Sequence, residues 1–329
     1  MNIKYDILGI GNAIADILAP VEQGFPEKEG LVPGSMTLID ADRMQALRAK
    51  IRPEAEMGGG SVANSCVIAA QLGATVAYLG KVARDDAGTK FGSDLRASGV
   101  DFPSAPLDGH AEENLATACC IVLVTPDGQR TMCTYLGACT SFSPDDVLAD
   151  RIEAAKIIYL EGYLFDPPHA QEAFRRAATL AHRAGSKVAL SLSDPFCVGR
   201  HRKAFQELVE GHIDILFANE DEICALCQTE DFEAAASKIG TETDLTALTR
   251  SGEGSVILNK GQRLNISPVP TKVVDTTGAG DAYAAGFLAG LTSGRTLEEC
   301  GRLASVAASE VISHFGARPQ GNPWEDMIS

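Results

Sequence analysis

Residues 273–287, VVDTTGAGDAYAAGF, place the acid Asp281 directly after Gly278, Ala279 and Gly280, at the start of a helix-like stretch. Backbone N–H groups in such a turn, with the positive end of the following helix, can bind an anion. A carboxylate beside a bound phosphate has a use if it accepts the proton of a hydroxyl group that attacks the phosphorus. One interpretation of the stretch is therefore phosphoryl transfer, with Asp281 as base and Gly278–Gly280 as anion hole. The competing interpretation is a helix start that Asp281 merely caps, and this stretch alone favours neither.

The amino-terminal stretch LGIGNAIAD contains two further polar residues, Asn12 and Asp16, just past a predicted strand. Ligands of open α/β sheets bind at such strand ends, although a turn Asn and a surface Asp would fit the same pattern. The pair Gly9-x-Gly11 resembles the start of a dinucleotide fingerprint, but Ile14 stands where the third glycine belongs. A Rossmann dehydrogenase is therefore disfavoured, and the P-loop pattern G-x-x-x-x-G-K-[ST] does not occur.

A third stretch, MGGGSVANS, has glycines before a predicted helix. Gly59 and Gly60 would let a ligand approach the backbone closely. Ser61 and Asn64 are spaced to share one face of the helix. A helix entry with Ser61 as its cap is the simpler interpretation.

These residues need a scaffold, and the chain alternates apolar strand-like runs with amphipathic helical runs. That alternation predicts an α/β fold: a mostly parallel central sheet with helices on both faces. Two segments interrupt it, a Pro/Gly-rich one at 17–40 and one at 112–138 that predicts two strands around the turn Pro126-Asp127-Gly128. We expect these two segments to form a small β lid, and 1–16, 41–111 and 139–329 to form a large nucleotide-binding domain.

Bulk composition excludes several classes of protein. The net charge of −16, without a basic run, argues against nucleic acid as a partner. The chain has no signal-peptide pattern at its start and no long apolar run, so we expect a cytoplasmic protein without a membrane partner. The nine cysteines are scattered along a large chain, which argues against a disulfide framework.

Taken together, the motifs resemble those of the ribokinase-like carbohydrate kinases of the PfkB family, most closely its adenosine kinase branch. The matching stretches are GNAIAD, GGGSVANS, YLGKVARDDAG, FANEDE and DTTGAGDAYAAGF, in the same order from about Tyr5 to about Pro319. The resemblance implies a ribokinase-like fold and the transfer of the γ-phosphoryl group of ATP to the 5'-hydroxyl of a nucleoside, with adenosine as the first expectation.

The resemblance also implies roles for individual residues. Asp281 would be the catalytic base, and Gly278, Ala279 and Gly280 the anion hole. The residues that would bind the nucleoside are Asn12, Asp16, Gly59, Gly60, Ser61 and Asn64. Those that would contact ATP are Asn219, Arg250, Ser251, Gly252 and Gly254. Glu222 would organise Mg²⁺ through water, and Asp275 with Thr277 would bind a monovalent cation such as K⁺.

Several alternatives stay open at this stage. A ribokinase-type sugar kinase or an inosine/guanosine kinase would share these motifs, and a non-catalytic nucleoside or sugar sensor could share the fold. The chain could act as a monomer or a homodimer. Four aromatic residues are candidates for contact with a base, although burial in the core is the more common fate of such side chains: Tyr135, Phe142, Tyr163 and Phe165.

Overall fold

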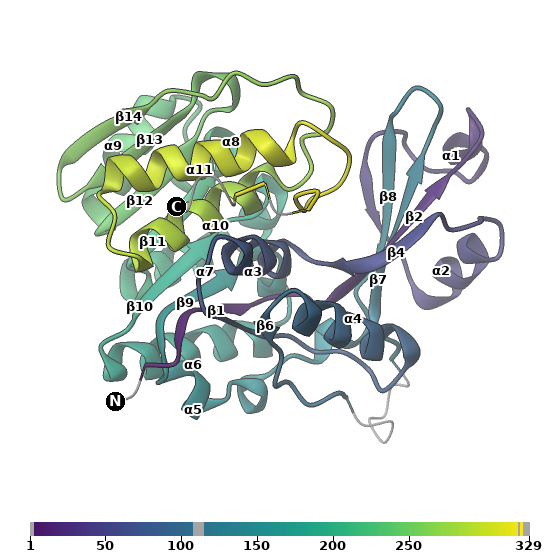
Figure 1. Cartoon of the computed structure of the whole chain (residues 1–329), viewed down its shortest axis with the longest axis horizontal. Coiled ribbons are helices and arrows are strands. Elements are labelled where there is room, and N and C mark those ends of the chain that lie inside the picture. Colours follow the sequence, from purple (N-terminus) through teal and green to yellow (C-terminus); the bar gives the residue numbers. More distant parts are fainter. Residues whose placement is uncertain (1–2, 108–114, 322, 325–329) are drawn as a thin grey trace.

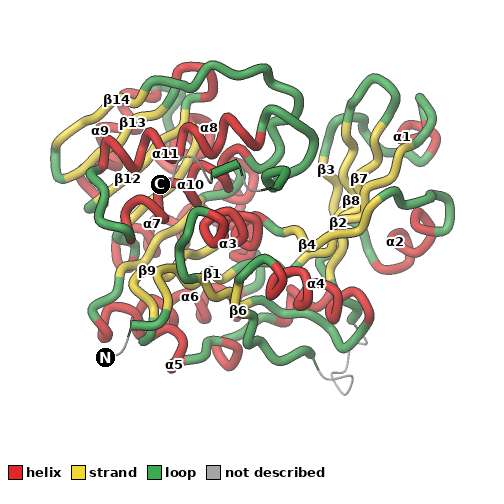
Figure 2. The backbone as a smooth tube through the Cα atoms, viewed as in Figure 1, coloured by secondary structure: helices red, strands yellow, loops and turns green. Residues whose placement is uncertain are grey.

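The computed structural model describes residues 3–107, 115–321 and 323–324. A large body is built on one sheet, and a smaller sheet lies beside it (Figure 1). Residues 112–114 of the expected lid, and residues 1–2, 108–111, 322 and 325–329 of the expected large domain, lie outside the described residues. The tube view shows the strands of the smaller sheet gathered at one end of the molecule (Figure 2).

The large sheet has nine strands, and its order follows from the pairing of neighbours. In that order they are β14 (Gln262–Ile266), β13 (Ser255–Asn259), β12 (Leu245–Thr249), β11 (Ile215–Asn219), β10 (Lys187–Ser191), β9 (Ala155–Glu161), β1 (Tyr5–Ile10), β5 (Val76–Leu79) and β6 (Val100–Asp101). Pairing is parallel from β12 through β6, whereas β13 and β14 pair antiparallel at one edge. The predicted mostly parallel sheet is confirmed.

Helices cover both faces of this sheet, as expected for buried parallel strands. On one face lie α3 (Ser61–Gln71), α4 (Asp86–Ala97), α10 (Ala279–Thr292) and α11 (Leu297–Val311). On the other lie α5 (Ala149–Ile152), α6 (Pro168–Ala184), α7 (Pro195–His212), α8 (Glu220–Cys227) and α9 (Phe232–Glu242). Strand alternation explains the two cores, because Ile7 of β1 packs into the first and Leu8 into the second. Short 3₁₀ helices span Gly137–Ser141, Pro144–Asp146, Gly162–Phe165 and Ser251–Glu253.

The smaller sheet has the strand order β3 (Met36–Leu38), β8 (Arg130–Tyr135), β7 (Ala118–Val124), β2 (Ile14–Pro20) and β4 (Ala55–Gly59). Strands β7 and β8 form the predicted hairpin around Pro126-Asp127-Gly128, with Gly128 in the left-handed region at φ +82°. One face of the sheet packs on a small core to which α1 (Phe25–Lys28) and α2 (Ala41–Arg48) contribute. We refer to this sheet and its two helices as the lid.

The lid is larger than the sequence boundaries suggest. Strand β2 begins at Ile14, and both α2 and β4 belong to the lid, although residues 41–111 were expected in the large domain. The difference has a physical reason: β4 reads AEMGG, which lacks the apolar alternation by which a strand is predicted.

Two further observations concern the chain as a whole. None of the helices in the described ranges combines the length and the apolar character that crossing a bilayer would require. All nine cysteines are free thiols.

Candidate active site

Asp281 lies in the first turn of α10, which begins after Gly278. Its carboxylate accepts hydrogen bonds from the hydroxyl of Ser61 at 2.6 Å and from Nδ2 of Asn64 at 3.4 Å. Neither Asp281 nor Ser61 caps its own helix, since glycines occupy both N-cap positions and no side chain caps either helix. The structure thus orients Asp281 by contacts from another helix, and the capping interpretation does not describe it.

The backbone before Asp281 leaves N–H groups open. Within the described ranges, the N–H groups of Gly278, Gly280 and Asp281 donate to no protein acceptor, whereas that of Ala279 donates to the carbonyl of Thr276 at 3.2 Å. The two glycines differ in their surroundings. A Cβ on Gly278, where φ is +80°, would lie 2.7 Å from the backbone of Ala317, but one on Gly280 would meet nothing within 4 Å. The N–H groups of Gly278, Gly280 and Asp281 could therefore donate to a bound anion, and there is free space for it at Gly280.

Helix α3 supplies the neighbours of Asp281, which confirms that Ser61 and Asn64 share one face. The hydroxyl of Ser65, one turn beyond Ser61, also donates to the backbone carbonyl of Asp281 at 2.9 Å. Asn64 is held in turn by Arg318, whose Nε donates to Oδ1 of Asn64 at 2.8 Å. With its Oδ1 occupied by a donor, Asn64 presents its amide nitrogen to Asp281.

Asp16 lies on β2, in the lid, opposite Met57 of the neighbouring strand β4, and its carboxylate reaches Gly59 of that strand. A Cβ on Gly59 would lie 2.2 Å from the Asp16 carboxylate, so this position admits only glycine while Asp16 keeps its place. Burial raises the pKa of Asp16 to about 6, and the charge of Asp281 adds to this, while Arg318 and Arg130 oppose it. Asp16 and Asp281 therefore lie close enough to sense each other across the boundary between lid and body.

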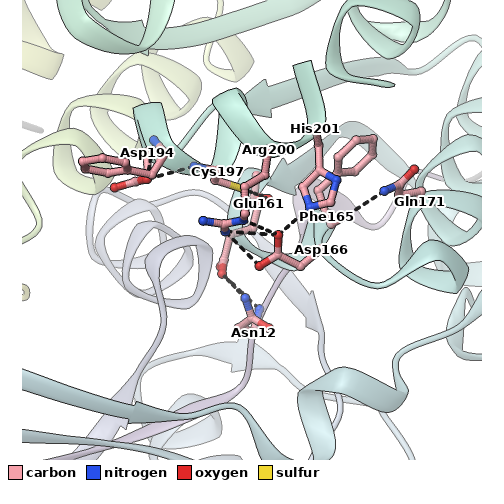
Figure 3. A network of polar contacts seen from close by, with 11 residues as sticks. Asn12, Glu161, Phe165, Asp166, Gln171, Asp194, Cys197, Arg200 and His201 are labelled. Carbon is pink, nitrogen blue, oxygen red and sulfur yellow. Dashed lines mark hydrogen bonds and ion pairs between the residues drawn. The ribbon is translucent and has the colours of Figure 1, made fainter. Parts of the chain in front are cut away.

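Asn12 is held by a buried carboxyl group that the sequence reasoning missed. Oε1 of Glu161, at the end of β9, accepts from Nδ2 of Asn12 at 2.9 Å and from its backbone N–H at 3.3 Å (Figure 3). Oε2 of Glu161 accepts from the backbone N–H of Val62 at 2.9 Å. Glu161 is only 1% exposed, and it fills the space that a Cβ on Gly11 would need. It thus ties the end of β1 to the first turn of α3.

Besides Asp16, two further carboxyl groups in this cluster have strongly raised pKa values. Burial raises the pKa of Asp281 to about 6, although its bonds from Ser61 and Asn64 and the charge of Arg318 lower it. Burial raises the pKa of Glu161 to about 7, against its hydrogen bonds from Val62 and Asn12. Such a concentration of perturbed acids is typical of functional sites.

The expected ATP-contacting residues lie at the carboxyl ends of β11 and β12, which are parallel neighbours. Asn219 and Glu222 form a capping box at the start of α8: Asn219 donates its backbone N–H at 3.0 Å and its amide at 2.7 Å to Glu222. Burial, followed by the nearby charges of Asp194, Asp221 and Asp281, raises the pKa of Glu222 to about 7. A cation would relieve this repulsion. Because Asn219 already binds both oxygens of Glu222, the pair fits a Mg²⁺ ion held mainly by phosphate and water.

The loop after β12 contains the other expected ATP contacts. Arg250 lies over the ring of Phe232 at 4.2 Å and pairs with Glu220 at 3.1 Å and Glu253 at 2.8 Å. Gly254 has φ +87°, and a Cβ there would lie 2.1 Å from the carbonyl of Ile266, so the turn itself requires glycine at this position. Ser251 and Gly252 are exposed beside it. Asn219 and this loop are thus brought to one edge of the sheet, while the Arg250 side chain already has protein partners.

Asp275 and Thr277 lie together, as expected, but Asp275 does not have the surroundings of a cation ligand. Oδ1 of Asp275 accepts from the N–H and hydroxyl of Thr277 at 3.1 and 2.7 Å. Oδ2 accepts from the N–H of Gly316 at 3.0 Å and forms an ion pair with Arg130 at 2.7 Å. The residues present do not fit the predicted monovalent cation, because the protein itself saturates this carboxylate.

The four aromatic candidates for contact with a base differ in their burial. Tyr135 packs in the lid core, whereas Phe142 and Phe165 pack in the core of the large sheet. Tyr163 is the exposed one of the four. Core packing thus accounts for three of these side chains.

The fold and the site together are those of a phosphotransferase with an alcohol group as acceptor, and in this site a carboxylate lies beside a turn whose N–H groups have no protein acceptor. The chain matches the pfkB family carbohydrate kinases over residues 34–325, and it belongs to that family. The match confirms the ribokinase-like fold and the family that the motifs indicate.

Individual relatives carry names of two kinds. The structure of adenosine kinase from Sinorhizobium meliloti is 48% identical, with a TM-score of 0.89 and coverage of 97% of each chain. A probable sugar kinase protein from Rhizobium etli CFN 42 is 42% identical, with a TM-score of 0.89 and coverage of 97% of this chain and 96% of that one. Adenosine kinase 2 of Arabidopsis thaliana is 28% identical over 343 residues, which cover 95% of this chain and 96% of the relative. The chain is therefore a nucleoside or sugar kinase, and such kinases use ATP, typically with Mg²⁺.

Proposed function

We propose that the protein transfers the γ-phosphoryl group of ATP to the 5'-hydroxyl of a nucleoside, with adenosine as the preferred acceptor and AMP as the product. The observation that carries the proposal is the position of Asp281, hydrogen-bonded to Ser61 at 2.6 Å and adjoining the open N–H groups of Gly278 and Gly280. Phosphoryl transfer requires alignment and charge stabilisation more than covalent chemistry, and this arrangement supplies both. In this role Asp281 accepts the hydroxyl proton while the turn holds the phosphoryl oxygens.

A nucleoside acceptor is supported by the face of the lid sheet that carries Asp16, which is opposite the face that packs on the lid core. Strand pairing places Cys120 beside Asp16, then Thr134 beside Cys120 and Leu38 beside Thr134, all on one face of the sheet. A second row lies on the same face: Val122 is beside Leu18, Met132 is beside Val122, and Met36 is beside Met132. A free sugar would have little use for this apolar surface. A flat base would bury apolar area against it while Asp16 and Asn12 bind the ribose hydroxyls.

Mg²⁺ would neutralise charge on the transferring phosphoryl group when bound, and Glu222 would orient its water shell.

A sugar kinase is the second candidate, since the Rhizobium etli relative is named a probable sugar kinase. The cytoplasmic location and the monomeric or homodimeric state stay predictions.

The test is a panel of acceptors assayed by ADP release: adenosine, inosine, guanosine, ribose and fructose. We expect the highest kcat/KM for adenosine and little ADP release with either free sugar. A free sugar that surpasses every nucleoside would replace the proposal with the second candidate. No ADP release above the water-only rate with any acceptor would favour the sensor interpretation.

A further inference from the structure

The carboxylate of Asp275 precedes the anion-binding turn, and protein groups contact both of its oxygens. It accepts three hydrogen bonds, from the N–H and hydroxyl of Thr277 and the N–H of Gly316, and it forms an ion pair with the guanidinium of Arg130. An ionised carboxylate offers about four lone-pair sites. A potassium ion could therefore bind Asp275 only by displacing one of these groups.

Arg130 supplies the positive charge at this position. It projects from lid strand β8 and lies 2.7 Å from Asp275, with the two side chains 13% and 8% exposed. Its guanidinium also lies 5.3 Å from the ring centroid of Phe315. Guanidinium is more weakly hydrated than a compact cation, and it stacks on aromatic faces, so it suits a buried ion pair of this kind.

We propose that Arg130 is a built-in counter-ion of the phosphate-binding loop, which replaces a monovalent cation at Asp275 and makes the enzyme independent of potassium. The inference rests on the proposed function, because it concerns the loop that would hold the transferred phosphoryl group. It replaces the sequence-based prediction of a cation bound by Asp275 and Thr277. Because Arg130 belongs to the lid and Asp275 to the body, this ion pair joins the two parts.

The wild-type protein gives the first test. Thermal melts without substrate and ADP-release assays with adenosine are run in KCl and in choline chloride at equal ionic strength, so that general screening is the same. A ligand that binds the folded state raises Tm, so a potassium site would show in the melts even without activity. We expect the same Tm in both salts, and rates that agree within about twofold, because matched screening leaves only specific binding. A higher Tm in KCl, or a rate that requires potassium, would overturn the proposal.

The variant Arg130→Gln gives the second test. It leaves the Asp275 carboxylate buried without its counter-ion and frees one acceptor position, so KCl should raise the Tm of this variant. The response should vanish in Arg130→Gln/Asp275→Asn, which has no unpaired charge. Arg48→Gln is the matched control, because it removes a lid arginine from an exposed pair with Glu56 and should behave as wild type.

If Arg130→Gln responds to KCl no more than the double variant does, Arg130 is not a substitute for a cation and the proposal fails. If Arg130→Gln does not fold, the wild-type comparison still decides. The melts need no substrate, so they can be interpreted even if the proposed kinase activity is absent.

Discussion

The hydroxyl of Ser61 donates a 2.6 Å hydrogen bond to the carboxylate of Asp281, although 220 positions separate the two residues in the sequence. The bond joins the first turn of α3 to the first turn of α10, two helices that pack against each other. It holds the carboxylate in one orientation before any substrate arrives. It also favours the ionised form of a carboxyl group whose pKa is raised by burial.

This bond predicts a shift in the pH profile. The base must be ionised to accept a proton, so kcat/KM for the nucleoside should rise with pH through the Asp281 pKa of about 6. In Ser61→Ala the stabilising bond is lost, so this limb should move to higher pH by about one unit, the size expected for a hydrogen bond to a charged group. Rates measured from pH 5 to 9 provide the test, with Ser93→Ala on the exposed side of α4 as control. An unmoved limb would mean that Ser61 does not control the ionisation of Asp281.

The space at Gly280 predicts a variant that folds but binds ATP poorly. Alanine is favoured over glycine in helices by about 1 kcal/mol, and its Cβ would meet no atom of the protein within 4 Å, so Gly280→Ala should keep its Tm. The methyl group would instead enter the space where the anion binds, and KM for ATP should rise. Gly211→Ala in α7 is the matched control, since that position is equally open. Unchanged ATP kinetics in Gly280→Ala would place the phosphate elsewhere.

Replacing Asp16 should weaken the binding of the nucleoside and leave the binding of ATP unchanged. Loss of hydrogen bonds to a charged group costs about 1.5 to 3 kcal/mol, so calorimetry should show roughly 10- to 100-fold weaker nucleoside binding in Asp16→Ala. ATP affinity should stay the same, because the expected ATP contacts lie at the end of β11, at the start of α8 and in the loop after β12, all outside the lid. Asp42→Ala, on the exposed side of α2 in the same lid, serves as control. Equal nucleoside affinity in wild type and Asp16→Ala would remove this residue from the site.

The raised pKa of Glu161 predicts that the stability of the folded protein depends on pH. Its pKa is raised from 4.5 to about 7 in the folded protein, mainly by burial, so folding favours the protonated form. As pH rises from about 5 to about 8, the folded protein must ionise this buried group and loses stability. Glutamine does not ionise. Relative to wild type, the free energy of unfolding of Glu161→Gln should therefore rise over this interval by roughly 1 to 3 kcal/mol.

Urea unfolding at several pH values measures this difference, with the exposed Glu172→Gln on α6 as control. Parallel stability curves for wild type and Glu161→Gln would mean that Glu161 is not the group that titrates.

Much of the fold was predictable because its signals are local. Runs such as KIIYL and KVALS predict buried strands, and the helical runs between them predict the parallel sheet that the structure contains. Ser61 and Asn64 were placed on one helix face by their spacing alone. Strand β4 was not predicted because AEMGG has one glutamate and two glycines in place of an apolar pattern.

Other features depend on contacts between distant parts of the chain. Glu161 follows an apolar strand, and nothing near it in the sequence indicates that it will bind Asn12, 149 positions away. The pairing of Arg130 with Asp275, and of Arg318 with Asn64, likewise arises only when the lid and the carboxyl-terminal segment are folded against the body. The motif that includes Asp275 indicated a cation at this position, but the charge present there belongs to Arg130.

The most direct test of the central claim is the turnover of Asp281→Asn with adenosine and ATP, measured beside calorimetry of ATP binding. Asparagine keeps the size of the side chain but cannot accept the hydroxyl proton as a base. We predict that kcat falls by about 10²- to 10⁴-fold, the usual contribution of general-base catalysis, while ATP affinity is retained. Near-normal turnover in this variant would contradict the assignment of Asp281 as the base.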